Sequence, residues 1–232
     1  MQSEMNIWTK VCMPLTQRTA QILNTKQKEL HEIQWTNGEA NTDSEFSRLA
    51  CISCEEAWNH IKRMETVYND VSLTANPPDI NISFYKDSNI LASGKIELKS
   101  GKTPSIPGST ILKLNINQPV IFCLRNESNL PFEFRYSQYH NSVGETNSDM
   151  FQDRSPRYPV NFTKMTDINV PIEYVHKEKG DWAEHYAKCA LFRIAEKKSH
   201  SWQDDLVEKI IKLFIKKTSI EEFSRLKQGL SQ

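Results

Sequence analysis

Two carboxylic acids and a lysine have a spacing that suits catalysis on a hairpin. Residues 80–85 and 90–99 each alternate apolar and polar side chains and flank a short polar turn, which predicts two antiparallel strands. Glu97 and Lys99 fall on the polar face of the second strand, and Asp79 enters the first strand behind two prolines. The two carboxylates can hold a hard cation, and Lys99 can orient or help deprotonate a water. This pattern favours phosphodiester hydrolysis.

These motifs resemble the PD-(D/E)XK nuclease superfamily, whose best-known members are type II restriction endonucleases. The resemblance rests on Pro78-Asp79 followed by Glu97-Leu98-Lys99, and Pro-Asp occurs only once in the chain. It implies an Mg²⁺-dependent DNA endonuclease with an α/β fold, in which a mixed central β-sheet is flanked by helices. It also implies that Asp79 and Glu97 bind the metal with the main-chain carbonyl of Leu98, and that Lys99 positions the attacking water.

The same hairpin allows a plainer interpretation, in which the charged face of an amphipathic strand is simply solvated. Three functions therefore stay open. The first is a sequence-specific endonuclease of double-stranded DNA, of the type II restriction class. The second is a repair or recombination nuclease that recognises DNA structure rather than sequence. The third is a non-catalytic protein that binds nucleic acid, or whose charged hairpin is only a solvated surface.

The clearest helical pattern precedes the hairpin. Thr42 and Glu45 form a capping box, and apolar residues then recur along one face, which predicts a helix over residues 43–68. The resemblance implies an accessory acid on this helix, and Glu45 and Glu56 are the candidates. We favour Glu45 as a fourth catalytic residue. Capping is the alternative role for both acids, Glu45 with Thr42 and Glu56 with Ser53.

Further strands are expected to complete a catalytic sheet core that spans residues 76–136. Residues 120–124 form an apolar run, which is typical of a strand buried on both faces. Residues 131–136 alternate again, with their aromatic side chains on the inward face. Between the hairpin and these strands, residues 109–117 are predicted to form a short helix packed on the sheet.

A candidate DNA-recognition segment follows at residues 137–171. It has little periodicity and is rich in the residue types that read base edges and bind phosphate. The predicted DNA-binding residues are Lys102, Gln138, His140, Asn141, Arg154, Arg157 and Lys164. An ordinary polar excursion is the alternative for the segment. For His140, a general base and a plain hydrogen-bonding residue are further alternatives.

Composition narrows the class of protein. The chain has 29 basic and 29 acidic residues, which argues against a protein that coats nucleic acid indiscriminately but allows a local basic cleft. The five cysteines lack the spacing of a disulfide framework. Cys51 and Cys54 are predicted to be buried or neighbouring thiols, and a metal or redox role for this pair is the alternative. The sequence has no apolar run long enough to span a bilayer and no signal-peptide pattern. We therefore expect a soluble, cytoplasmic protein without a membrane partner.

The whole of residues 1–232 is expected to form one nuclease domain. Residues 1–70 are predicted to be its helical N-terminal part, and residues 181–230 to be a set of C-terminal helices. The C-terminal helices either complete the core or form a homodimer interface. An enzyme that cuts palindromic DNA needs such an interface, because two-fold DNA symmetry requires two-fold protein symmetry.

Overall fold

A computed structural model describes residues 7–35, 44–110, 115–126, 130–143 and 157–178. Contacts divide the chain into two units, residues 1–184 and 185–232, and every described residue lies in the first. The predicted C-terminal helices at 181–230 therefore fall outside the described residues. The prediction that residues 1–232 form one domain therefore stays a prediction.

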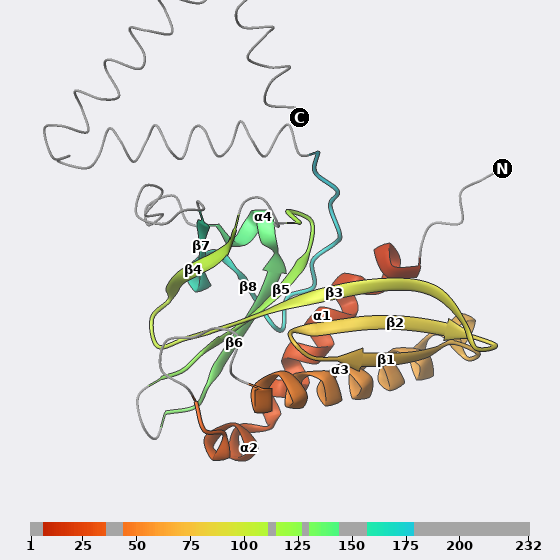
Figure 1. The fold of residues 1–232 in the computed structure, drawn as a ribbon, viewed down its shortest axis with the longest axis horizontal. Coiled ribbons are helices and arrows are strands. Elements are labelled where there is room, and N and C mark those ends of the chain that lie inside the picture. The colour runs from red at the N-terminus through yellow and green to blue at the C-terminus, as the bar shows by residue number, and fades with distance from the viewer. Residues whose placement is uncertain (1–6, 36–43, 111–114, 127–129, 144–156, 179–232) are drawn as a thin grey trace, which may run out of the picture. The chain divides into compact units, whose positions relative to one another are not determined.

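The centre of the described chain is a mixed six-stranded sheet with the order β1-β2-β3-β5-β6-β8 (Figure 1). Its strands are β1 (Ser72–Asn76), β2 (Ile80–Lys86), β3 (Asn89–Gly101), β5 (Pro119–Leu124), β6 (Glu133–Gln138) and β8 (Thr166–Asp167). Neighbouring strands pair antiparallel, except β3 and β5, which run parallel. The predicted hairpin and the predicted strands at 120–124 and 131–136 are confirmed.

Helices flank this sheet, which confirms the predicted α/β class with a mixed central sheet. They are α1 (Ile7–Thr25), α2 (Gln27–Glu32), α3 (Ser44–Met64) and the 3₁₀ turn η1 (Thr66–Tyr68). Helix α1 packs on α3, β3, β5 and β6, while α3 packs on β1 and β2. The predicted helix over 43–68 ends early, because the chain tightens into η1 after Met64. No helix in the described ranges has the length and apolar character needed to cross a bilayer.

Strand β3 changes partner halfway along its length. Its first part pairs antiparallel with β2. This pairing stops at Ile96, which lies opposite Ile80, the first residue of β2. Its second part pairs parallel with β5, starting at Glu97 with Val120. The strand therefore runs through a fork in the sheet, where β2 has ended and β5 has begun. Figure 1 shows β3 as the long strand that passes from one group of strands to the other.

The segment after β3 differs from the predicted helix at 109–117. Strand β4 (Ser105–Thr110) instead pairs antiparallel with β7 (Arg157–Asn161) in a separate two-stranded sheet. A one-turn helix, α4 (Tyr139–Ser142), contacts β7 of this small sheet and the 3₁₀ turn η2 (Phe162–Lys164). The helix prediction is wrong over the described residues because β4 is fixed by a partner far along the chain, which local periodicity does not reveal.

The core lies where the strands meet the helices. Strand β5 is buried along almost its whole length, as its continuous apolar run predicts. The alternating aromatics of the segment before and within β6 are buried as predicted; they are Phe132, Phe134 and Tyr136. Cys51 and Cys54 are buried free thiols, and burial raises the pKa of Cys51 to about 12. A thiol with so high a pKa is a poor metal ligand or redox nucleophile.

An extended segment, residues 168–178, crosses the fold without regular secondary structure, and we call it the strap. The Gln138 amide pairs with both the N–H (2.7 Å) and the C=O (3.0 Å) of Val175. Asn117 pairs in the same way with Lys177, at 2.8 and 2.9 Å. The Tyr136 hydroxyl donates to one main-chain carbonyl of the strap and accepts one N–H. Side chains thus supply the hydrogen bonds that a neighbouring strand would supply in a sheet.

The indole of Trp8 lies against Gly94 so closely that a Cβ there would overlap the ring. Gly94→Ala must therefore displace the indole or bend β3. We expect it to lower the free energy of unfolding by about 1–3 kcal/mol, the usual effect of overpacking. Urea denaturation measures this, with Ser93→Ala at the exposed neighbouring position as the control. Wild-type stability of Gly94→Ala would contradict the packing described here.

Candidate active site

Asp79 lies in the tight turn that joins β1 to β2. Its main chain is left-handed, with φ at 56°, a conformation that aspartate tolerates better than most residues. The Asn81 amide fastens the turn by donating to the Pro78 carbonyl at 2.6 Å. The Asp79 carboxylate then reaches β3, where Oδ1 accepts the Leu98 N–H at 2.9 Å. Beyond Ile96, β3 no longer pairs with β2, and the Asp79 carboxylate accepts the main-chain N–H that a strand partner would otherwise bind.

Glu97 is on the polar face of β3, as predicted, yet its environment is not that of a solvated face. Only 7% of the residue is exposed. Four donor groups surround its two oxygens. Oε1 accepts from Lys99 Nζ at 2.6 Å and from the Ser109 hydroxyl at 2.5 Å. Oε2 accepts from the Gln118 amide at 3.1 Å and from Lys95 Nζ at 3.4 Å. A carboxylate so buried and so fully bonded is a built feature rather than a surface charge.

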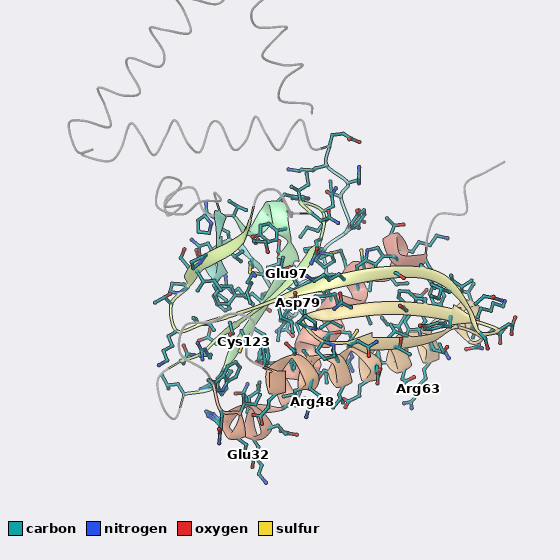
Figure 2. All side chains as sticks on the ribbon, viewed as in Figure 1. Glu32, Arg48, Arg63, Asp79, Glu97 and Cys123 are labelled. Atoms are coloured by element: carbon teal, nitrogen blue, oxygen red, sulfur yellow. The ribbon has the colours of Figure 1, made fainter. Side chains whose placement is uncertain are left out.

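Lys95 joins the two carboxylates. Its Nζ lies 2.8 Å from Asp79 Oδ2 and 3.4 Å from Glu97 Oε2. With Lys99, the site holds two negative and two positive groups, which we call the fork cluster: Asp79, Lys95, Glu97 and Lys99. Figure 2 labels Asp79 and Glu97 close together where β3 leaves β2.

The electrostatics of the fork cluster keep Glu97 ionised. Burial by itself would raise the pKa of Glu97, but Lys99, Ser109 and Lys95 together hold the pKa below its ordinary value. Burial likewise would lower the pKa of Lys95, and its two carboxylate partners raise it instead. Both members of the pair are therefore charged at neutral pH.

The donor set of the fork cluster fits a hard divalent cation. A positively charged nitrogen already lies between Asp79 Oδ2 and Glu97 Oε2. Mg²⁺ commonly takes one or two carboxylates and fills its remaining positions with water and phosphate oxygens. The main-chain carbonyl of Leu98 is the further ligand that the sequence suggests. The described residues contain no group of three or more His, Cys, Asp or Glu side chains placed to hold a metal, so such a cation would depend on these other oxygens.

The two acids proposed as accessory residues on α3 point elsewhere. Glu45 is exposed, and its carboxylate accepts the Gln34 N–H at 3.3 Å. Glu56 forms an ion pair with Lys26 at 2.7 Å. Both candidates are thus engaged with the N-terminal helical region rather than with the fork cluster.

A third acid of α3, Glu55, lies nearer the site. Its carboxylate accepts the N–H of Ala75 at 3.2 Å, on strand β1 just before the turn that carries Asp79. Cys51, one helical turn earlier, donates its thiol to the Asp79 carbonyl at 3.5 Å. Glu55 therefore belongs to the helix face that meets the site. The signal in the sequence is an acid on the otherwise apolar stripe of an amphipathic helix.

Sequence reasoning also missed the two neutral partners of Glu97. Ser109 comes from β4, and Gln118 from the residue just before β5. Ser109 is itself fixed, because its N–H donates to the Tyr139 hydroxyl at 2.6 Å. Nothing in the local pattern marks either residue, since parallel pairing of β3 with β5 and the small second sheet bring them to Glu97.

The predicted DNA-binding residues separate into three groups. Gln138 and His140 are buried and hydrogen-bonded to the strap, and a DNA contact for them stays a prediction. The residues that are exposed, for which a DNA contact stays a prediction, are Lys102, Asn141 and Lys164. The residues whose side chains fall outside the described set are Arg154 and Arg157. An amide or imidazole side chain in the sequence suggests an exposed binding residue. Here main-chain atoms of the strap satisfy the hydrogen bonds of these side chains, so the side chains are buried.

Comparisons with known proteins add no family to this geometry. No protein family model matches the chain, and no curated protein matches its sequence significantly. The fork cluster is therefore the feature of this chain that bears on its function.

The lowered pKa of Glu97 predicts an acid dependence of stability. An ionised group whose folded pKa lies below its unfolded pKa stabilises the fold above the unfolded value, and this contribution is lost as the pH falls through the folded value. We therefore expect the free energy of unfolding to fall more steeply on acidification below the ordinary glutamate pKa in wild type than in Glu97→Gln. Urea denaturation across a pH series measures the slopes.

The control for this experiment removes an equal charge elsewhere. Glu32→Gln lies at the exposed end of α2 and should keep the wild-type slope. Parallel slopes for wild type and Glu97→Gln would show that the Glu97 charge is not stabilised by the fold.

Proposed function

We propose that this chain is an Mg²⁺-dependent DNA endonuclease of the PD-(D/E)XK type. The observation that carries the proposal is the fork cluster. Asp79, from the turn before β2, and Glu97, from β3, direct carboxylate oxygens at one point, and Lys99 lies 2.6 Å from Glu97. A solvated hairpin face gives no reason for Glu97 to be buried with four hydrogen-bond donors around it.

The residues of the fork cluster divide the work of phosphodiester hydrolysis. Asp79 and Glu97 would hold the cation with the Leu98 carbonyl, and a bound Mg²⁺ supplies polarisation of the phosphoryl oxygen and activation of water. The Lys99 ammonium is close to Glu97 and largely shielded, with 11% of its side chain exposed. There it positions the attacking water and stabilises the charge that builds up on the phosphate. Ser109 and Gln118 keep Glu97 in one orientation.

Within this class we favour a type II restriction enzyme that cuts double-stranded DNA at a specific sequence as a homodimer. Lys102 comes directly after the end of β3, the strand that carries Glu97 and Lys99, and is exposed to solvent. An exposed cation there suits a phosphate contact beside the site. A nuclease that recognises DNA structure uses the same cluster and differs only in which substrate it accepts.

Removal of one group from the fork cluster tests the proposal. We expect Asp79→Asn, Glu97→Gln and Lys99→Met each to lower Mg²⁺-dependent DNA cleavage by at least ~10²-fold, the usual loss for a catalytic group. DNA affinity measured with Ca²⁺ should change little, because the lost groups act on the reacting phosphate. Lys86→Gln, on the β2–β3 hairpin and away from the fork, is the charge-matched control. Wild-type cleavage by any of the three variants would refute the site.

The cleavage products distinguish sequence recognition from structure recognition. Long unmodified plasmid and phage DNA incubated with the protein and Mg²⁺ should give discrete bands, which a chelator abolishes. Smears, or cuts only at branched junctions, would replace the restriction class with a structure-specific nuclease. Absence of cleavage on linear, supercoiled and branched DNA would favour the non-catalytic interpretation of the charged hairpin.

A further inference from the structure

The ammonium of Lys95 lies between the two carboxylates of the fork cluster, where a metal would bind. We propose that the Lys95 ammonium occupies the cation position of the metal-free site and that a divalent metal binds by displacing it. The inference rests on the proposed function, because it assigns the same two carboxylates as metal ligands. It adds a residue that the Pro-Asp and Glu-x-Lys motifs do not contain.

The position of Lys95 is the first support. Its Nζ contacts one oxygen of each carboxylate, 2.8 Å from Asp79 and 3.4 Å from Glu97. These are the two groups that a metal would have to bridge. A second cation at this point would lie within contact distance of the ammonium, and like charges so close repel strongly in a partly buried site. The ammonium and the metal are therefore mutually exclusive.

The second support is that Lys95 is the donor best able to leave. Each oxygen of Glu97 has two donors, so at least one must move to free a lone pair for a metal. Lys99 is nearly enclosed, with 11% of its side chain exposed, and lies 2.6 Å from Glu97. The Ser109 hydroxyl is at 2.5 Å and is held by its own β4 strand. Lys95 makes the longest contact to Glu97 and has 39% of its side chain exposed to solvent.

The fold also explains why a lysine is useful there. Without a cation at the position of the Lys95 ammonium, Asp79 and Glu97 would face each other with only Lys99 as a compensating charge, and burial of an uncompensated carboxylate is costly. Lys95 neutralises the pair and keeps both oxygens aimed at one point. The metal site is thereby preformed, and its affinity is reduced by the work of removing the ammonium.

Direct metal binding tests the exchange without recourse to catalysis. Mn²⁺ is titrated into wild type, Lys95→Gln and Lys95→Arg by calorimetry. Because Lys95→Gln removes the competing charge, we expect it to bind Mn²⁺ about tenfold more tightly than wild type, the equivalent of one charge-assisted hydrogen bond. Lys95→Arg keeps the charge and should bind as wild type does. Lys86→Gln, which removes a lysine of the hairpin, should leave affinity unchanged.

A measurement on the unmutated protein keeps the test valid if Lys95→Gln fails to fold. Amine acetylation followed by peptide mass spectrometry reports how available each lysine is. Saturating Mn²⁺ should raise the acetylation of Lys95 several-fold, because its nitrogen leaves the two carboxylates, while Lys86 stays constant. Unchanged labelling of Lys95 at saturating Mn²⁺ would overturn the exchange.

The outcomes separate this inference from the proposed function. If Lys95→Gln binds Mn²⁺ no more tightly than wild type, and wild type still cleaves DNA with Mg²⁺, the exchange is wrong and the nuclease stands. If neither wild type nor Lys95→Gln binds Mn²⁺, the carboxylates are not a metal site and both proposals fail. Tighter binding by Lys95→Gln alone, with increased labelling of Lys95 in wild type, supports the exchange.

Discussion

The negative charge of Glu97 is the constraint on which the rest of the site depends. A carboxylate with 7% exposure is stable only if the chain supplies what water would have supplied. Lys95 and Lys99 come from the same strand, while Ser109 and Gln118 lie 12 and 21 residues away along the chain. Each of these elements has to be in place before the charge is tolerated. The small β4–β7 sheet therefore contributes to the site although it carries none of the predicted catalytic residues.

The change of partner along β3 explains why this point in the sheet is available for chemistry. Where one strand pairs on both edges throughout, its main chain is fully occupied. Here the edge of β3 that faced β2 becomes free beyond Ile96, and the Asp79 carboxylate occupies the N–H of Leu98. The opposite edge is meanwhile fixed by β5. One edge is thus open to a side chain and the other is held rigid, which brings two carboxylates together without distorting the strand.

Local patterns predicted much of this arrangement, and the failures have a common cause. Alternation in residues 80–99 predicted the hairpin that carries Glu97 and Lys99, because a hairpin is built from neighbours in sequence. The predicted helix at 109–117 failed because the partner strand of β4 is remote. Gln138 is predicted to contact DNA because glutamine is a residue type that reads base edges, yet its amide binds main-chain atoms 37 residues later. Sequence periodicity carries no information on such distant pairings.

The divided pairing of β3 also sets an order for the folding of the protein. Its first half closes on β2 through a short turn, and such local contacts form quickly. Its second half must wait for β5, because parallel pairing closes a longer loop and loses more chain entropy first. The partners of Glu97 from β4 and from the residue before β5 arrive with that second event. We therefore expect the protein to acquire its buried charge late in folding.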